Sequence, residues 1–309
     1  MKIILAGTDY FSVNVADQIQ SDLVAVLSIG NRIKHRGMKQ TSPELVNWAE
    51  HNHIPAIQSD NLNRPELKPE IKSYQPDLLV VASFGKKIPS WLIDLPTYGG
   101  INVHPSLLPK YRGMAPVTRA IMNGDKITGV TIHKLTAKID AGEIISQTSA
   151  EIDINEDDYQ LKTKLAVLGG KMIKDILPGL TRVNLTYTPQ DKNQVSYAPG
   201  ITKEDRVINW NSSNINIYNQ VRALHPQPLA VTSVQEKIIE VVQVGLGQQS
   251  AELSNSQLPP GTLLSRKNPE IMTGSGTIRL LKVKPASRKI ISGQDLINGF
   301  RIKPGVRFR

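Results

Sequence analysis

The order of apolar and helical segments along roughly the first 180 residues is the feature that most constrains the fold. Short apolar runs alternate there with stretches of helical periodicity, which is typical of a parallel sheet whose strands are joined by crossover helices. A helix is expected after Ser42, which would cap it, with Pro43 at its first position. The expected strands are residues 2–6, 23–28, 54–57, 78–83 and 101–104.

The pattern changes at Thr128. The stretches "TGVTIHKL" and "EIISQTSAEI" alternate as antiparallel strands do, and a helix is expected over 156–176. Residues 189–205 are polar, carry two prolines and show no periodicity, which is typical of an interdomain linker. We therefore expect a first domain over 1–188, of the α/β class with a Rossmann-like, mostly parallel sheet.

The last third of the chain predicts a second, smaller domain over 206–309. Asn211 and Ser212 are expected to cap one helix, and "PEIMTGSGTIRLLKV" predicts a hairpin because its glycines accept the positive φ of a tight turn. One helix with short strands is typical of a small OB-like β-barrel. Residues 206–309 hold 14 Lys and Arg against 5 Asp and Glu, nearly all of the chain's net charge of +10. Such a domain is expected to bind the phosphate backbone of a nucleic acid.

Several function classes are disfavoured by composition. The chain has no Cys, which excludes disulfides and thiolate nucleophiles and fits a reducing cytoplasm, where we expect the protein. No stretch approaches the ~20 apolar residues of a membrane helix. "GTDYFS" lacks the repeated glycines of a dinucleotide fingerprint, so no nucleotide cofactor is expected. No metal is expected either, and His133 is interpreted as a strand-face residue and His225 as a surface or loop residue.

Two polar residues on one expected strand are the candidates for chemistry. Asn102 and His104 project from the same face of a strand that Pro105 ends, at the carboxyl edge where open α/β sheets bind ligands. An amide donor and an imidazole can both address the oxygen of a carbonyl that becomes tetrahedral. Asp140, in the turn "KIDAGEI", is the expected third group. Residue types alone fit a hydrogen-bonded core histidine and a turn aspartate better, so both interpretations stay open at this point.

Longer motifs around these residues resemble folate-dependent formyltransferases. "NVHPSLLPKYRGMAP", followed by "IDAGEI", is similar to the family's Asn-His-Asp signature, "ILAGTDYFS" to its opening and "RGMKQTSPE" to its basic loop. "ITKEDRVINW" and "VRALHPQP" resemble its interdomain junction, and "PPGTLL", "SGQDLINGF" and "PGVRF" resemble parts of its carboxyl domain. The resemblance covers essentially the whole chain. It is strongest to the branch that formylates methionyl-tRNA, which makes 1–188 the formyltransferase catalytic domain and 206–309 the tRNA-binding domain.

The resemblance implies roles for the site residues. Asn102 and His104 would stabilise the oxyanion formed when the α-amino group of methionyl initiator tRNA attacks the formyl carbon of 10-formyltetrahydrofolate. Asp140 would orient His104 and assist proton transfer, with no metal and no covalent enzyme intermediate. The residues implied to bind tetrahydrofolate are Ser106, Leu107, Leu108 and Pro109, with the backbone of Ser83, Phe84 and Gly85.

The resemblance also implies contacts with initiator tRNA, for a protein that supports translation initiation and that we expect to be a monomer. Arg36 and Lys39 lie in or beside the loop that the family inserts into the acceptor arm, and Lys203 lies in the junction. Two alternatives stay open. One is a formyltransferase for a small amine, an amino sugar nucleotide or glycinamide ribonucleotide, because Pro105 matches the glycinamide branch. The other is a non-catalytic tRNA-binding protein.

Overall fold

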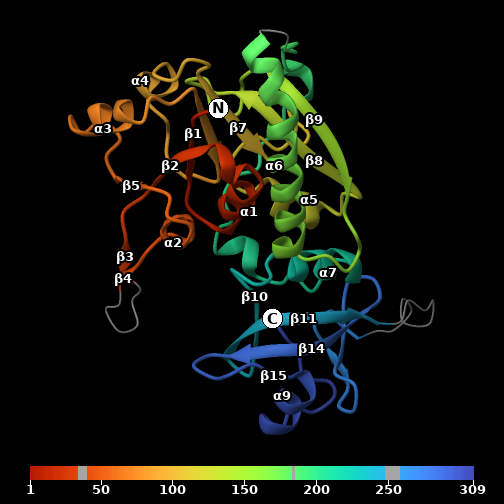
Figure 1. Ribbon diagram of the computed structural model, residues 1–309. Coiled ribbons are helices and arrows are strands. Elements are labelled where there is room, and N and C mark those ends of the chain that lie inside the picture. Colours follow the sequence, from red (N-terminus) through yellow and green to blue (C-terminus); the bar gives the residue numbers. More distant parts are fainter. Residues whose placement is uncertain (34–39, 183–184, 248–257) are drawn as a thin grey trace. The chain divides into compact units, whose positions relative to one another are not determined.

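The computed structural model describes residues 1–33, 40–182, 185–247 and 258–309, and it divides into two compact units (Figure 1). The domain limits expected from the sequence, with a linker over 189–205, stay a prediction. Among the described residues, no helix is both long and apolar enough to cross a membrane. The first unit comprises Met1–Pro116, Ile127–Glu151 and Leu161–Pro199; the second comprises Val117–Lys126, Ile152–Gln160 and Gly200–Arg309.

A seven-stranded sheet, counted within the described residues, forms the middle of the first unit. Its order is β5-β2-β1-β6-β7-β8-β9; the strands from β5 to β7 are parallel, whereas β8 pairs antiparallel with both β7 and β9. The mostly parallel α/β sheet and the antiparallel strands after Thr128 are therefore confirmed. The strands are β1 (Ile3–Gly7), β2 (Leu23–Ser28), β5 (Ala56–Gln58), β6 (Leu78–Ala82), β7 (Gly100–His104), β8 (Ile127–Lys134) and β9 (Ile144–Glu151).

Helices cover both faces of this sheet. On one face Gly169 of α6 packs against Val103 of β7, and α1 lies beside α6. On the other face Leu67 of α3 and Leu92 of α4 are buried in one cluster with Leu79 of β6. The helices and short elements of this part of the chain are α1 (Tyr10–Ile19), η1 (Gln20–Asp22), β3 (Arg32–Ile33), β4 (Gln40–Thr41), α2 (Glu44–His51), α3 (Leu67–Ser73), α4 (Ser90–Ile93), α6 (Asp158–Arg182) and η2 (Lys192–Gln194).

Two expected helix limits were wrong. Pro43 has an extended ψ of 147°, so it is the N-cap and α2 begins at Glu44; Ser42 does not cap the helix. The helix expected over 156–176 continues to Arg182 and contains Pro178. Leu180, beyond the proline, is buried, and this packing outweighs the backbone hydrogen bond that the proline removes.

The second unit is built on a curled, barrel-like antiparallel sheet of order β10-β11-β14-β13-β12, with β15 paired to β14. The hairpin predicted from "PEIMTGSGTIRLLKV" is confirmed as β13 and β14. The α7 helix is capped by Ser213, whose Oγ accepts from the Asn216 amide at 3.3 Å, so the caps expected at Asn211 and Ser212 were wrong. The elements are α5 (Pro116–Asn123), η3 (Glu204–Arg206), α7 (Asn214–Ala223), β10 (Ala230–Val234), β11 (Lys237–Leu246), β12 (Leu263–Ser265), β13 (Glu270–Met272), β14 (Thr277–Pro285), β15 (Ile291–Ser292) and α9 (Gly293–Gly299).

The strand order fixes where the first unit can hold a ligand. The chain leaves β1 toward β2 and β5, then returns to the other side of β1 as β6, which creates a topological switch point. The segments after β1 and β6 are tied together there: Thr8 Oγ1 donates to the carbonyl of Phe84 at 3.2 Å, and Ser83 Oγ donates to Asp9 Oδ2 at 2.7 Å. The neighbouring strand β7 is parallel to β6, so its carboxyl end, with Asn102 and His104, lies at the same edge of the sheet.

The central strands should carry the stability of the first unit. Leu79 is 1% exposed, so Leu79→Ala should lower the free energy of unfolding by about 2–5 kcal/mol through lost transfer energy and a residual cavity. Ile127→Ala is the control, because Ile127 is 59% exposed and should cost about 0.5 kcal/mol or less. Urea denaturation of the full chain measures both, and equal shifts of the two midpoints would contradict the assignment of the core.

Candidate active site

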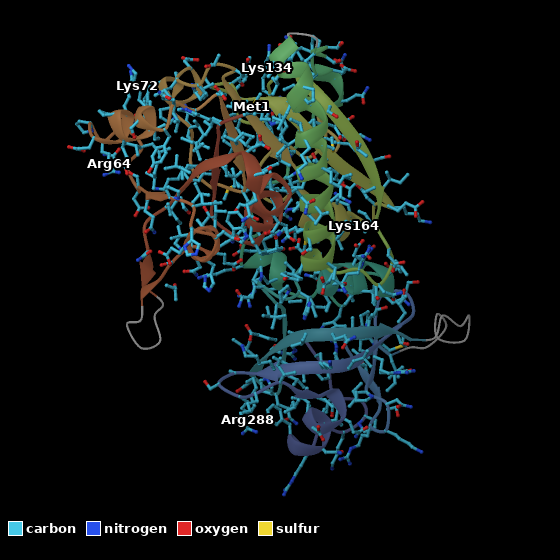
Figure 2. All side chains as sticks on the ribbon, viewed as in Figure 1. Met1, Arg64, Lys72, Lys134, Lys164 and Arg288 are labelled. Carbon is cyan, nitrogen blue, oxygen red and sulfur yellow. The ribbon has the colours of Figure 1, made fainter. Side chains whose placement is uncertain are left out.

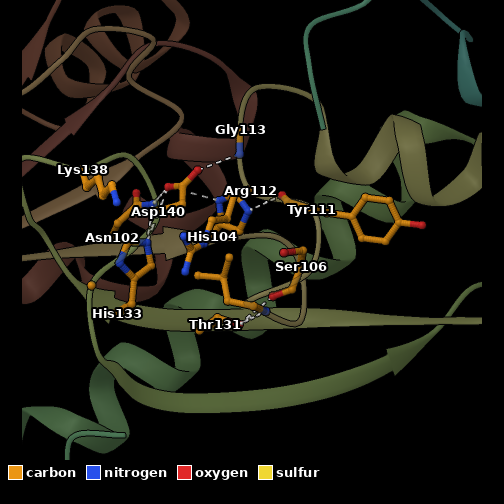
Figure 3. Close-up of polar contacts among 12 residues, drawn as sticks. Asn102, His104, Ser106, Tyr111, Arg112, Gly113, Thr131, His133, Lys138 and Asp140 are labelled. Atoms are coloured by element: carbon orange, nitrogen blue, oxygen red, sulfur yellow. Dashed lines mark hydrogen bonds and ion pairs between the residues drawn. The ribbon is translucent and has the colours of Figure 1, made fainter. Parts of the chain in front are cut away.

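The pairing of β7 with β8 brings four side chains together. Asn102 lies directly opposite His133 in the antiparallel register, and His104 lies opposite Thr131. Val103, between the two polar residues of β7, points to the other face, where it meets α6. Figure 3 shows that Asn102 and His104 turn toward Asp140, which comes from the turn between β8 and β9.

The carboxamide of Asn102 makes two contacts through its nitrogen. Nδ2 lies 3.1 Å from His133 Nε2 and donates to Asp140 Oδ1 at 3.3 Å. His133 Nδ1 lies 2.8 Å from the carbonyl of Lys134, which can only accept, so we assign the proton of the neutral ring to Nδ1. Nε2 is then the acceptor for the Asn102 amide, and the carboxamide is held in one orientation.

Asp140 is held by the loop that follows β7. Its Oδ2 accepts from the Gly113 amide at 2.8 Å. Its own backbone is left-handed, with φ at 50°. Gly113 has φ at 119°, and a Cβ there would lie 2.8 Å from the carbonyl oxygen of Ala198, so no other residue fits this position without strain. Glycine at position 113 therefore allows the backbone conformation in which the loop points this N–H at the carboxylate of Asp140.

His104 is anchored by the same loop. Its Nε2 donates to the carbonyl of Tyr111 at 2.9 Å, which leaves Nδ1 of the neutral ring without a proton. Nδ1 faces Asp140 Oδ1 at 3.7 Å, a distance too long for a hydrogen bond. The two side chains are only 5% and 10% exposed. The carboxylate thus faces the imidazole without bonding to it.

Burial and charge set the protonation states of this pair. Burial is the largest influence on His104 and lowers its pKa, while the Asp140 carboxylate raises it; the net pKa lies below 6.5. Burial alone would raise the pKa of Asp140, but the His133 and His104 rings and the Gly113 amide outweigh it, so that pKa lies below 3.8. Of these partners the Gly113 amide is the firmest, because His133 Nε2 is 3.6 Å from Oδ1 and does not hydrogen-bond it. At neutral pH His104 is an uncharged base and Asp140 a carboxylate.

This geometry suits the addition of a nucleophile to a carbonyl group. A proton lost by the nucleophile can pass to Nδ1 of His104, and the Asp140 carboxylate stabilises the imidazolium that results. An N–H of Asn102 can donate to the oxygen that becomes negative. Within the described residues, no group of three or more His, Asp or Glu is arranged to hold a metal ion.

The segment expected to bind tetrahydrofolate, Ser106 to Pro109, directly follows β7. It is fixed by Thr131, whose Oγ1 donates to the carbonyl of Ser106 at 2.7 Å and accepts from the Leu108 amide at 3.1 Å. Gln147 Nε2 donates to the carbonyl of Leu108 and to Thr131 Oγ1, at 2.9 and 2.8 Å. The loop therefore has a defined backbone shape beside His104. Its part in binding a ligand stays a prediction.

The second expected folate segment lies at the end of β6, the strand next to β7. Ser83 and Gly85 both have positive φ, at 52° and 71°. Phe84 is 3% exposed and its side chain packs in the core, so only its backbone is available to a ligand, and its part in binding folate stays a prediction. The structure brings this segment to the same sheet edge as Asn102 and His104.

The structure does not test the residues expected to contact tRNA. Arg36 and Lys39 lie outside the described residues. Lys203 is exposed and belongs to the second unit, where it precedes η3. Their roles stay predictions.

Sequence reasoning misses several residues that shape the site. The alternation around His133 predicts an ordinary strand-face residue, yet its ring holds Asn102; only the register of β8 on β7 shows this. His225, by contrast, lies in a loop of the second unit as expected, with its Nδ1 at 2.8 Å from Asp157 Oδ2. Gln190 contacts the turn that carries Asp140, and no motif in the sequence marks it.

Two family models match the chain. The model described as formyl transferase matches residues 2–177, and the one described as formyl transferase, C-terminal domain, matches residues 200–301. A methionyl-tRNA formyltransferase of Dictyoglomus turgidum is 34% identical, with 100% of this chain and 99% of the relative covered. A methionyl-tRNA formyltransferase of Lysinibacillus sphaericus is 36% identical, with 96% of this chain and 95% of the relative covered.

Solved structures share the fold at lower identity. One is WlaRD, a sugar 3N-formyl transferase, with a TM-score of 0.62, 21% identity, and 94% of this chain and 99% of that chain covered. Another is HypX from Aquifex aeolicus in complex with tetrahydrofolic acid, with a TM-score of 0.64, 17% identity, and 98% of this chain and 48% of that chain covered.

The lowered pKa of Asp140 predicts a pH-dependent contribution to stability. In the wild type the contribution is complete above the unfolded pKa, about 3.9, and is lost as the pH falls through the lower folded value. Asp140→Asn has no such contribution, so the difference between wild type and variant should shrink between pH 7 and pH 3. Urea midpoints at both pH values measure it, with Glu151→Gln, an exposed carboxyl on β9, as control. A difference that is the same at both pH values would contradict the prediction.

Proposed function

The chain belongs to the formyl transferase family, and on that premise we propose that it transfers the formyl group of 10-formyltetrahydrofolate to the α-amino group of methionyl initiator tRNA, a reaction that supports translation initiation. The observation that carries the proposal is the convergence of Asn102, His104 and Asp140 at the carboxyl edge of the sheet. Relatives that cover the full chain carry the name methionyl-tRNA formyltransferase, which supports the choice of acceptor.

The proposed reaction is a direct transfer. The amine nitrogen adds to the formyl carbon, a carbon–nitrogen bond forms, and the carbonyl oxygen becomes negative. Nδ1 of His104 accepts the proton of the amine, since Nε2 already donates to the carbonyl of Tyr111. The proton then passes to the folate nitrogen as its bond to the formyl carbon breaks, which leaves formyl-methionyl-tRNA and tetrahydrofolate.

Asn102 and Asp140 act on the charges of this step. Of the two contacts that Asn102 Nδ2 makes, the 3.3 Å bond to Asp140 is the longer. We assign the N–H that makes this longer bond as the donor to the oxyanion. Asp140 stabilises the imidazolium of His104 across 3.7 Å. The backbone of the loop, through Tyr111 and Gly113, keeps the base and the carboxylate in place.

The folate is assigned to the edge of the sheet beside the trio. Ser106, Leu107, Leu108 and Pro109 form a loop held by Thr131 and Gln147, and the backbone of Ser83 to Gly85 lies at the end of the neighbouring strand. The HypX structure of the same fold is a complex with tetrahydrofolic acid, which supports a folate cosubstrate here. The trio is assembled from the described residues of one chain, which fits the proposed monomer, and the proposed role in translation initiation places the protein in the cytoplasm.

The second unit is assigned to the tRNA. A groove of about 820 Å³ lies in this unit and is lined by Arg206, Lys284 and Lys289, with Glu240 paired to the first two at 3.2 and 2.9 Å. Lys203 belongs to the same unit and is proposed to contact the tRNA as well. Arg36 and Lys39 are the further tRNA contacts that we propose. Neutralised phosphates release counterions, so affinity should fall with salt.

One assay tests the reaction and its acceptor. Purified protein with 10-formyltetrahydrofolate should formylate methionyl initiator tRNA and leave an amino sugar nucleotide and glycinamide ribonucleotide unchanged. Asn102→Ala should lower kcat roughly 100- to 1,000-fold, because an oxyanion donor is removed, whereas Asn63→Ala, at an exposed asparagine of the same unit, should leave it unchanged. Equal rates with a small amine would assign the protein to the sugar or glycinamide branches instead, and absence of any transfer would leave a tRNA-binding protein.

Charge variants test the role of the second unit. Lys282→Gln, Lys289→Gln and Lys303→Gln combined remove three exposed cations and should raise the tRNA KM while leaving kcat unchanged. The salt slope of tRNA binding should become shallower by roughly 0.7 to 0.9 for each phosphate that the variant no longer neutralises.

The control removes three exposed cations of the first unit, Lys68, Lys72 and Lys171. Figure 2 labels Lys72 on α3, and Arg288 among the side chains of the second unit. Equal effects of the two triple variants would show that net charge, and not the second unit, governs tRNA binding.

A further inference from the structure

We propose that Gln190 is a positioning residue of the reaction: it holds the turn that carries Asp140 against the loop that holds both Asp140 and His104. The proposal rests on the function assigned to these residues above. It gives a stretch that the sequence predicts to be a linker, residues 189–205, a direct part in the geometry of the trio.

Gln190 makes hydrogen bonds with both of its side-chain polar atoms. Nε2 donates to the carbonyl of Asp140 at 3.0 Å and to the carbonyl of Gly142 at 2.7 Å. Oε1 accepts from Arg112, at 3.1 Å from Nε and 2.7 Å from Nη2. One half-buried side chain thus spans two loops that are far apart in the sequence.

The chemistry of these partners fixes the amide orientation. A guanidinium can only donate and a backbone carbonyl can only accept, so Oε1 must face Arg112 and Nε2 must face the turn. The donors to Oε1 are charged, which makes these bonds stronger than neutral ones. The flip that is ambiguous for many glutamine side chains is therefore settled here by the partners.

The two loops that Gln190 joins are the ones that position the trio. Arg112 stands between Tyr111, whose carbonyl holds His104, and Gly113, whose amide holds Asp140. The backbone of Arg112 is also paired with the segment after Gln190: its N–H donates to the carbonyl of Ser196 at 2.9 Å, and its carbonyl accepts from Ala198 at 2.7 Å. The same stretch therefore fixes the loop by its backbone and the turn by Gln190.

The turn needs such a restraint. Asp140 has a left-handed backbone, with φ at 50°, which a residue with a Cβ adopts at an energetic cost unless its surroundings hold it. Gly142 is in close contact with the carbonyl of Lys134, so the turn is packed tightly on β8. Gln190 bonds the carbonyls of Asp140 and Gly142 themselves. Without it, the carbonyls of Asp140 and Gly142 would lose these bonds, and the carboxylate would depend more on its side-chain contacts and on the packing of Gly142.

Two variants of Gln190 separate its bonds to Arg112 from its bonds to the turn. Gln190→Met removes all four hydrogen bonds at similar size. Gln190→Glu keeps acceptors for Arg112 but turns a carboxylate oxygen toward two carbonyls. Because small displacements of a catalytic group cost up to about 100-fold, both variants should lower kcat roughly 10- to 100-fold, with the KM for either substrate within about twofold. Gln194→Met is the matched control, since Gln194 is exposed and its side chain donates to Asp191, in the same stretch.

A double-mutant cycle distinguishes positioning from a general structural role. If Gln190 acts through Asp140, Gln190→Met should lower kcat at least five-fold less in an Asp140→Asn background than in the wild type. Urea midpoints of every variant show how much folded protein is present.

Each outcome decides the proposal. It is overturned if Gln190→Met or Gln190→Glu keeps the wild-type kcat, if the effect is the same in the Asp140→Asn background, or if activity falls only in proportion to the folded fraction. A wild-type protein that does not formylate methionyl-tRNA refutes the proposed function instead, so the two failures are distinguishable.

Discussion

The antiparallel pairing of β8 with β7 is the constraint on which the candidate site depends. It sets Asn102 against His133 and His104 against Thr131 on one face of the sheet. A shift of one residue in this register would move His133 and Thr131 to the opposite face of the sheet, away from Asn102 and His104. The same pairing starts the turn that returns Asp140 to the edge of the sheet, so one register places all three members of the trio.

Two kinds of support surround the trio, and they do different work. Side chains of β8 and β9 fix orientation: His133 holds the Asn102 amide, and Thr131 with Gln147 holds the loop from Ser106 to Pro109. Backbone groups of the loop after it set the tautomer of His104 and favour the ionised form of Asp140, because the Tyr111 carbonyl accepts from Nε2 and the Gly113 amide donates to the carboxylate. Burial lowers the pKa of His104 and keeps its ring uncharged. The result is an uncharged base beside a carboxylate in a buried setting, which is the arrangement that proton transfer from an amine requires.

The sequence predicts the parts of this structure that follow from local periodicity and from long motifs. The parallel sheet, the hairpin of the second unit and the shared face of Asn102 and His104 all come from spacing along the chain. Asp140 is a candidate because of its place in a polar turn, and the resemblance strengthens that choice. His133 and Gln190 could not be found in this way, since their partners are set by strand register and by a stretch without periodicity. The helix caps at Pro43 and Ser213 differ from the predicted ones by one or two residues. Pro43 is the N-cap through its extended backbone and makes no side-chain capping bond, whereas Ser213 is one of three adjacent residues with a side chain that can cap.

The central claim is that the trio presents a free, unprotonated Nδ1 of His104 to the substrate, opposite an ionised Asp140. Nitrogen-15 NMR of the histidine side chains at neutral pH tests it most directly. The account predicts that His104 is a neutral ring with its proton on Nε2, and that this state persists below the pH at which an ordinary histidine becomes charged. A proton found on Nδ1 of His104, bonded to Asp140, would contradict it.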